Sequence, residues 1–131
     1  MGWREFSLKA ISVPFAEHGR GYDGWDCWGL VTRGYEDVLG VALPDYHEAY
    51  GDTRQFRRLE RAFAARPECF WKRAKNPRPG AVALMRRRSL LIHVGLLMDG
   101  GTILHCEERT DTTLERASAM KVEGYYEYTA A

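Results

Sequence analysis

The hydrophobic positions in the first third of the chain follow the period of a helix. Apolar and small residues from Cys27 to Val38 recur every three or four positions, as they do on one buried helix face. Asp26 is a suitable N-cap for this helix, and Gly40 is a suitable end. The first 25 residues contain four glycines and a proline, so this stretch is predicted to be loop-like.

The second half of the chain has short apolar runs separated by turn signals. After a second predicted helix from Thr53 to Ala65, strands are predicted over 69–71, 81–85, 90–98, 102–106 and 122–128. Asp99-Gly100-Gly101 predicts a hairpin turn, and Arg86-Arg87-Arg88 is interpreted as a solvated loop. Residues 107–121 are polar and show no clear pattern. Helices first and antiparallel strands afterwards predict an α+β domain.

The composition is that of an ordinary globular protein. Of the 131 residues, 45% are hydrophobic and 28% are charged, which excludes a disordered or collagen-like chain. This length predicts one domain over residues 1–131. The 19 basic and 18 acidic residues leave a net charge of +1, so no nucleic-acid partner is expected.

Neither membrane insertion nor export is expected from the sequence. No apolar run approaches the about 20 residues of a spanning helix, and the N-terminal segment lacks the long apolar core of a signal peptide. We therefore expect a protein that is made and kept in the cytoplasm unless a larger assembly carries it out. Three cysteines without a CxxC pair predict neither a disulfide framework nor a structural zinc site, and no cofactor is predicted.

Cys27 is the first candidate for chemistry because it begins the predicted helix. Backbone N–H groups and the helix dipole at this position stabilise a thiolate, and the same N–H groups can hold an oxyanion. Cys27 also lies on the apolar face of the helix, where free cysteines are often buried. A nucleophile and a core cysteine are therefore both open interpretations.

Two histidines are predicted to share one face of a hairpin. With the turn centred on Gly100, His105 lies opposite Gly95, and His93 is then diagonal to His105. Gly95 has no side chain to separate the two rings. One histidine could act as the base for a thiol while the other orients its far nitrogen. The alternative is that each is a satisfied polar group in a half-buried strand.

Zinc is a competing use of the same side chains. Ligand types that zinc accepts are supplied by Cys27, His93, His105 and Cys106. However, His105 and Cys106 are adjacent in a strand and point to opposite faces, so they cannot bind one ion without a bulge. We predict no metal site, with Cys69 and Cys106 as spectators.

Four segments form an ordered set of motifs: GWDCWGLV at 24–31, RPGAV at 78–82, HVGL at 93–96 and ILHC at 103–106. In this order they resemble the nucleophile motif, the strand entry, the base motif and the following strand of the NlpC/P60 cysteine peptidases. The resemblance covers the chain from about residue 14 to residue 106. It implies a papain-like α+β domain in which a nucleophile-bearing helix packs on an antiparallel sheet.

The resemblance also implies roles for individual residues. Cys27 would be the nucleophile, His93 the general base and His105 the residue that orients it. The family commonly has a tyrosine that helps at the oxyanion site, and Phe15 stands in that place here, so the hydroxyl is missing. Tyr22 and His18 are candidates to replace it. The residues expected at the oxyanion site or substrate groove are Phe15, His18, Tyr22, Asp26 and Trp28, of which Asp26 is best interpreted as the N-cap and Trp28 as a packing or groove-wall residue.

Further motifs resemble the phage-tail branch of the family: Trp28 after the nucleophile, LPDY at 43–46 and GYY at 124–126. The implied function is a cysteine peptidase of a phage, prophage or gene-transfer particle tail. It would hydrolyse peptidoglycan stem peptides, at the bond between D-glutamate and a diamino acid. Its partners would be the stem peptide and phage-tail proteins, and the tail would deliver it to the periplasm or cell wall.

Two other functions fit the same motifs. One is a non-catalytic tail-assembly module, which predicts normal assembly with Cys27→Ala. The other is a cytoplasmic thiol hydrolase or acyltransferase that acts on a small amide or ester. The peptidase itself predicts a Cys27 thiol of depressed pKa that faces His93 across a groove.

Overall fold

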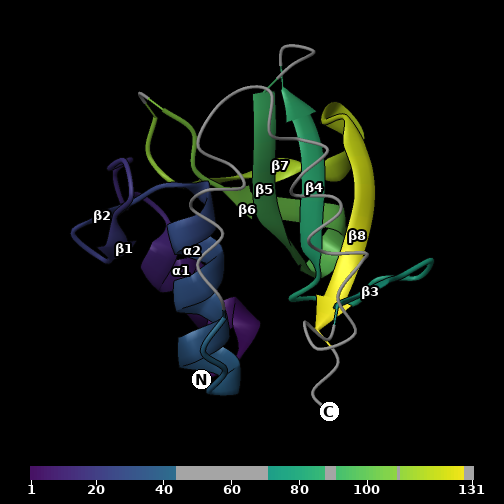
Figure 1. Ribbon diagram of the computed structural model, residues 1–131, viewed down its shortest axis with the longest axis horizontal. Helices are drawn as coiled ribbons and strands as arrows, with labels where there is room; N and C mark the ends of the chain where they lie inside the picture. Colours follow the sequence, from purple (N-terminus) through teal and green to yellow (C-terminus); the bar gives the residue numbers. More distant parts are fainter. Residues whose placement is uncertain (44–70, 88–90, 109, 129–131) are drawn as a thin grey trace.

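A computed structural model describes residues 1–43, 71–87, 91–108 and 110–128 of the chain; in these, helices lie beside an antiparallel sheet (Figure 1). The helices are α1 (Trp3–Ala10) and α2 (Cys27–Gly34), and α2 continues into the π-helical segment Tyr35–Leu39. The strands are β1 (Arg20–Gly21), β2 (Gly24–Trp25), β3 (Trp71–Arg73), β4 (Val82–Arg87), β5 (Leu91–Met98), β6 (Thr102–His105), β7 (Thr113–Arg116) and β8 (Val122–Tyr128). Short 3₁₀ turns cover Asp99–Gly101 and Ala117–Ala119.

The main sheet has the strand order β3-β8-β4-β5-β6-β7, with every neighbouring pair antiparallel. Strands β1 and β2 form a separate two-stranded ribbon beside the helices (Figure 1). This arrangement confirms the predicted order of helices first and antiparallel strands afterwards. The two central strands are β4 and β5, and the hairpin of β5 and β6 carries both candidate histidines.

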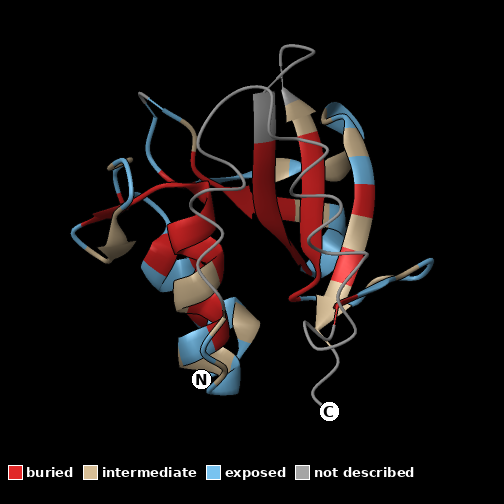
Figure 2. Ribbon diagram, in the orientation of Figure 1, coloured by how far each residue is buried: buried red, intermediate tan, exposed pale blue. Residues whose placement is uncertain are grey.

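Apolar side chains cover both faces of the sheet, and the central strands are buried (Figure 2). On one face the helices pack against alternate strand residues and form the larger apolar cluster. The strand residues of this cluster include Val82, Leu84, Val94, Leu96, Leu104 and Tyr126. The opposite face has a smaller cluster, formed by Ala81, Ala83, Met85, Leu97 and Ile103. Because successive strand residues alternate between faces, His93 and His105 lie on the side of this smaller cluster.

The predicted helix from Cys27 to Gly40 is confirmed in outline. Asp26 has extended backbone angles, and its side chain accepts a hydrogen bond from the Gly29 backbone N–H, as an N-cap does. The helical segment ends at Gly40, where Val41 N–H donates to the Tyr35 carbonyl at 3.1 Å. The strand predicted at 81–85, the hairpin turn and the strands of the hairpin are also confirmed.

Several short elements were not predicted from the sequence, among them α1, the β1–β2 ribbon and β7. Helix α1 forms within the stretch interpreted as loop because its eight residues contain no glycine or proline: Gly2 precedes it as the N-cap, and the other three glycines of that stretch follow it. Phe6 and Ala10 are fully buried on its inner face. Strand β7 lies in the polar segment 107–121. It pairs with β6 as the edge strand of the sheet. Its side chains are mostly exposed, so the sequence does not show the alternation of apolar and polar residues that indicates a strand.

The first two residues of the arginine run differ from its interpretation as a loop, and Arg88 lies outside the described residues. Arg86 and Arg87 continue β4 and pair with Ile92 and Leu91. Arg86 Nε donates to Glu123 Oε1 on the neighbouring strand β8 at 2.8 Å, so a cross-strand ion pair accommodates the charge. The predicted helix Thr53–Ala65 and residues 69 and 70 of the predicted strand 69–71 lie outside the described residues, while Trp71 begins β3.

Candidate active site

Cys27 is the first residue of α2, and the cap of this helix fixes its position. Asp26 Oδ1 accepts the Gly29 N–H at 2.8 Å, and the Asp26 residue is 4% exposed. Gly29 permits the helix to begin here because a Cβ on it would lie 2.1 Å from the Gly19 carbonyl oxygen. The motif Asp26-Cys27-Trp28-Gly29 is thus a capped helix start pressed against a loop, as its sequence suggested.

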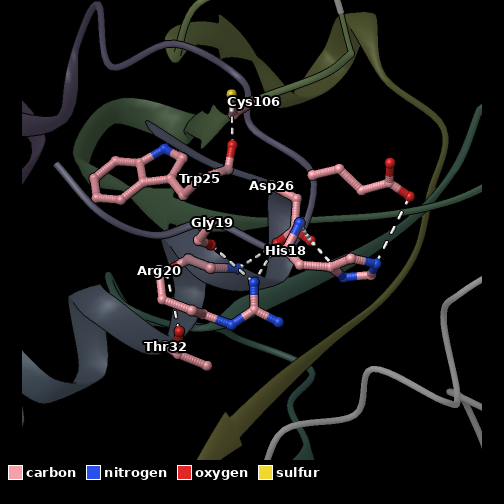
Figure 3. A network of polar contacts seen from close by, with 9 residues as sticks. His18, Gly19, Arg20, Trp25, Asp26, Thr32 and Cys106 are labelled. Carbon is pink, nitrogen blue, oxygen red and sulfur yellow. Dashed lines mark hydrogen bonds and ion pairs between the residues drawn. The ribbon is translucent and has the colours of Figure 1, made fainter. Parts of the chain in front are cut away.

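The same carboxylate holds that loop in place (Figure 3). Arg20 Nη1 donates to Asp26 Oδ1 at 2.8 Å, and the backbone N–H of His18 donates to Asp26 Oδ2 at 3.0 Å. His18 has a positive φ of 61°, and its ring Nδ1 lies 3.8 Å from Asp26 Oδ2. Asp26 therefore acts as a structural anchor for residues 18–20 as well as the N-cap, and His18 is positioned through it.

The Cys27 thiol is buried and protonated in the resting structure. Burial, followed by the nearby Asp26 charge, raises its pKa from 9.0 to about 12, although backbone hydrogen bonds from Val94 and Trp28 act in the opposite direction. The sequence-based expectation of a depressed pKa is therefore not met. The Trp28 N–H at the helix start and the Val94 N–H of β5 do reach the sulfur, but the loss of hydration and an adjacent carboxylate outweigh them.

The hydrogen-bond pattern of β5 explains how the thiol meets the sheet. Leu97 N–H donates to the Ala81 carbonyl at the β4 side, so alternate residues of β5, including Val94, direct their amides toward β6. The β5–β6 pairing extends from Met98↔Thr102 to Leu96↔Leu104. Val94 lies beyond this point and bonds Cys27 instead. The thiol thus sits against the backbone of β5 where β6 diverges, at the residue that follows His93.

The two histidines form the contact that the sequence predicted. His93 Nε2 and His105 Nδ1 are 2.9 Å apart, and the rings are 80° from coplanar. The residues are 5% and 1% exposed. A Cβ on Gly95 would lie 3.1 Å from His105 Cβ and 2.8 Å from the Leu104 carbonyl oxygen, so glycine is needed for this approach.

The outer nitrogen of His105 has a partner that sequence reasoning missed. His105 Nε2 lies 3.0 Å from Glu115 Oε1, whose strand β7 was not predicted. The register Ile103↔Glu115 and His105↔Thr113 places the Glu115 side chain on the face of His105. The sequence signal was weak, because Glu115 is one acidic residue in a polar segment.

A second carboxylate brings three potential metal ligands together. One ligand atom from each of His93, His105 and Glu107 lies within 4.8 Å of the other two. Two nitrogens bound to one tetrahedral zinc ion would lie about 3.3 Å apart. The observed 2.9 Å between the two ring nitrogens is instead an ordinary hydrogen-bond distance. The geometry therefore favours a bonded histidine pair in this state.

Cys106 points away from this cluster, in line with its adjacency to His105. Its thiol is close to backbone carbonyls, at 3.7 Å from that of Trp25 and 3.8 Å from that of Thr110. The Cys106 residue is 1% exposed. The structure therefore separates it from the two histidine side chains, as expected for neighbouring residues of one strand. Cys69 lies outside the described residues.

Two further predicted site residues, Trp28 and Phe15, lie near the start of α2. Trp28 is fully buried in the core, so its side chain packs rather than walls an open groove, while its backbone N–H reaches the Cys27 sulfur. Phe15 pairs by an isolated bridge with Trp25, two residues before Cys27, and is half-buried against the core. Its position near the helix start agrees with the alignment of the motif, and it offers no hydroxyl.

Tyr22 is placed elsewhere. Its hydroxyl donates to Asp37 Oδ2, which Arg33 Nε also contacts at 3.1 Å. Burial and Asp37 raise the pKa of Tyr22 to about 12. Asp37 is ten residues beyond Cys27, which is roughly 15 Å along a helix. The hydroxyl therefore ties the β1–β2 ribbon to the far end of the helix.

The fold and the site define the class of protein: an α+β domain with a cysteine at a helix start and two bonded histidines on an antiparallel sheet. A sequence model of the NlpC/P60 family matches residues 12–129, and the chain belongs to this family. Members are usually cysteine peptidases or peptidoglycan hydrolases, and some are non-catalytic. The family binds peptidoglycan.

Solved structures share this fold. The NlpC/p60 domain of the peptidoglycan hydrolase SagA is 16% identical, with a TM-score of 0.67 over 96% of each chain. NlpC1 from Trichomonas vaginalis is 15% identical with a TM-score of 0.69, over 98% of this chain and 44% of that one. RipD from Mycobacterium tuberculosis, a non-catalytic NlpC/p60 protein, is 15% identical with a TM-score of 0.62, over 98% and 95%. These likenesses confirm the predicted α+β fold.

A search of curated proteins gave no match. Within the described part of the chain, no helix has the length and apolar character needed to cross a membrane.

Substitution of Gly95 by alanine tests the close approach of the two histidine strands. The added methyl would meet the Leu104 carbonyl and His105 Cβ, so we expect a loss of about 1–3 kcal/mol in the free energy of unfolding and a disturbed histidine contact. Urea unfolding measures the stability. Gly21→Ala is the matched control, because no atom lies within 4 Å of its added methyl, and it should change stability by less than about 1 kcal/mol. Equal effects of the two variants would contradict this packing.

The raised pKa of Cys27 predicts a loss of stability at alkaline pH. The thiol keeps its proton in the folded state up to about pH 12, whereas the unfolded thiol loses it near pH 9.0, so the unfolded state gains between these values. Its contribution is fully present below pH 9 and falls by up to about 4 kcal/mol by pH 12. Tyr22 adds to the decline from pH 10 upward. Cys27→Ala should flatten the curve of unfolding free energy against pH, and parallel curves would show that the folded thiol titrates normally.

Proposed function

We propose that this protein is a cysteine peptidase that hydrolyses amide bonds in peptidoglycan stem peptides. The observation that carries the proposal is the arrangement of Cys27 at a capped helix start, against the strand that presents the bonded pair of His93 and His105. A thiol nucleophile needs a base and a group that orients the base. These residues supply all three parts from three different elements.

Each step of the proposed reaction has an assigned group. His93 Nε2 is engaged by His105, so Nδ1 is the nitrogen left to accept the proton of the Cys27 thiol. The sulfur then attacks the carbonyl carbon, and backbone N–H groups near the helix start stabilise the oxyanion. His93 returns the proton to the leaving amine, which leaves an acyl-enzyme. Water, deprotonated by His93, hydrolyses the thioester and restores the thiol.

The raised pKa of Cys27 changes the timing of this chemistry. The resting thiol keeps its proton, so the proton moves when the substrate binds rather than beforehand. Substrate contacts that stabilise the thiolate or the imidazolium would drive that transfer. The mechanism is therefore general-base catalysis by His93 and not attack by a preformed thiolate.

The proposed substrate is the bond between D-glutamate and a diamino acid of the stem peptide. The family binds peptidoglycan, and SagA is described as a peptidoglycan hydrolase, which supports this class of substrate. We further propose a role in the tail of a phage, prophage or gene-transfer particle, which would deliver the protein from the cytoplasm to the periplasm or cell wall. Support for that role comes from the motifs at 24–31, 43–46 and 124–126.

A non-catalytic wall-binding or tail-assembly module is the second candidate. The buried Cys27 thiol with its raised pKa favours this candidate, because a protonated cysteine is a weak nucleophile. RipD, which shares the fold, is described as a non-catalytic domain adapted to peptidoglycan binding. The intact set of Cys27, His93 and His105 favours the peptidase.

Digestion of purified stem peptides distinguishes the two candidates. We expect the wild-type protein, with reduced thiols, to release fragments that mass spectrometry assigns to one amide bond. Cys27→Ala and His93→Gln should each lower the rate by at least about 10³-fold. Cys106→Ala is the matched control, because it removes a buried thiol outside the site and should retain most of the activity. No cleavage by folded wild-type protein, with retention on insoluble peptidoglycan, would favour the binding module.

Particle assembly tests the role in a tail. In a phage or prophage that encodes this protein, we expect it to be found in purified particles, and deletion of the gene to abolish or impair them. Cys27→Ala particles should assemble but inject poorly if the peptidase acts at the wall. Absence of the protein from purified particles would overturn the tail proposal and leave the peptidase proposal intact.

A further inference from the structure

A line of polar contacts runs outward from His93 and does not end at the second histidine. His93 Nε2 contacts His105 Nδ1 at 2.9 Å, and His105 Nε2 contacts Glu115 Oε1 at 3.0 Å. His105 is 1% exposed, so its two ring nitrogens are held inside the protein by these two partners. The side chain of Glu115 is 39% exposed, so the line extends from the buried site to the surface.

The carboxylate at the outer end determines where the protons lie along this line. An ionised carboxylate only accepts hydrogen bonds, so His105 Nε2 must carry a hydrogen. In a neutral imidazole the other nitrogen, His105 Nδ1, is then an acceptor. His93 Nε2 must therefore carry the hydrogen of the inner bond, which makes His93 Nδ1 the acceptor nitrogen. One carboxylate thus selects the tautomer that the general base needs.

Without that carboxylate the reverse arrangement competes. His105 could carry its hydrogen on Nδ1 and donate it to His93 Nε2. His93 would then be protonated on Nδ1 and unable to accept the proton of Cys27. The inner hydrogen bond alone does not distinguish the two arrangements, since its length is the same in either direction.

The charge of the Glu115 carboxylate favours the same role for His93 as the tautomers do. When His93 takes the thiol proton it becomes an imidazolium, and its Nε2–H donates to His105. The Glu115 carboxylate, one ring farther out, stabilises that positive charge through the polarised His105. The charged groups that lie close to the histidine pair in the described residues are Glu107 and Glu115.

Glu107 does not fulfil this role, although it is also close. Its Oε1 lies 3.7 Å from His105 Nδ1, beyond hydrogen-bond length, and that nitrogen is already bonded to His93. Glu107 therefore adds charge near the pair without selecting a tautomer. This difference makes it a matched control for Glu115.

We propose that Glu115 is a positioning residue that fixes the tautomers of His105 and His93 and so prepares His93 Nδ1 as the base. The catalytic consequence rests on the proposed peptidase function, while the tautomer assignment does not. Glu115 acts through His105 and touches no reacting atom.

Nitrogen-15 NMR of the histidine rings tests the tautomers without any substrate. At neutral pH the full-length wild-type protein should show both rings with the hydrogen on Nε2. Glu115→Ala removes the acceptor and should shift His105, and with it His93, toward the Nδ1–H form. Glu115→Gln keeps an acceptor oxygen and should largely preserve the tautomers. Glu107→Gln should leave both rings unchanged, and thermal unfolding confirms that the variants are folded.

Kinetics on the stem peptide tests the consequence. Glu115→Gln should lower kcat about 10-fold with little change in KM, and should move the acid limb of the pH profile to lower pH, because the imidazolium loses a stabilising charge. Glu115→Ala should lower kcat further, and Glu107→Gln should stay within about twofold of wild type. If the wild-type protein cleaves nothing, the NMR result still decides this inference. Unchanged ring tautomers in Glu115→Ala, or equal kinetic effects of Glu115→Gln and Glu107→Gln, would overturn it.

Discussion

The buried carboxylate of Asp26 is the interaction on which the site depends. One oxygen caps α2 and binds Arg20, and the other accepts the His18 backbone N–H. The helix start, the loop at residues 18–20 and the entry from β2 are therefore fixed by a single side chain. Cys27 follows it directly, so its backbone position is set before any contact with the sheet is made. A helix this short depends on such a cap and on packing rather than on its own propensity.

The sheet supplies the other half of the site through a local departure from regular pairing. The β5–β6 ladder places His93 and His105 on one face, with Gly95 between them. Where β6 diverges from β5, the Val94 amide turns to the Cys27 sulfur. A fully paired hairpin would bond that amide to β6 and leave no place for the thiol. The Cys27 thiol thus reaches the backbone beside His93 because the ladder is incomplete at this point.

The sequence predicts the parts of this arrangement that depend on local rules. Asp26 before a helical period identifies the capped helix, and a two-glycine turn sets the register that brings His105 opposite Gly95. The helix cap and the hairpin register both depend on residues that are close together in the sequence, so a short segment of the chain is enough to predict each. The paired motifs then identify Cys27, His93 and His105 as a set.

The parts that were not predicted depend on contacts between distant segments. Glu115 reaches His105 only because an edge strand with little apolar pattern pairs with β6. The protonation of Cys27 depends on how completely the core excludes water, and helix-start position alone indicated the opposite direction. Tyr22 is not available for its candidate role at the oxyanion site because its hydroxyl donates a hydrogen bond to Asp37, fifteen residues later. Burial and side-chain partners of this kind follow from the assembled fold.

Two carboxylates lie at opposite ends of this region, and their effects differ. Burial, followed by the charge of the adjacent Asp26, keeps the proton on the Cys27 sulfur in the resting state. Glu115 lies beyond His105 and, in the proposed mechanism, determines which ring nitrogens carry hydrogens. In that mechanism the proton leaves the sulfur only when a substrate covers Cys27 and places a carbonyl dipole against the nearby N–H groups. A buried thiol that stays protonated between encounters is also protected from oxidation.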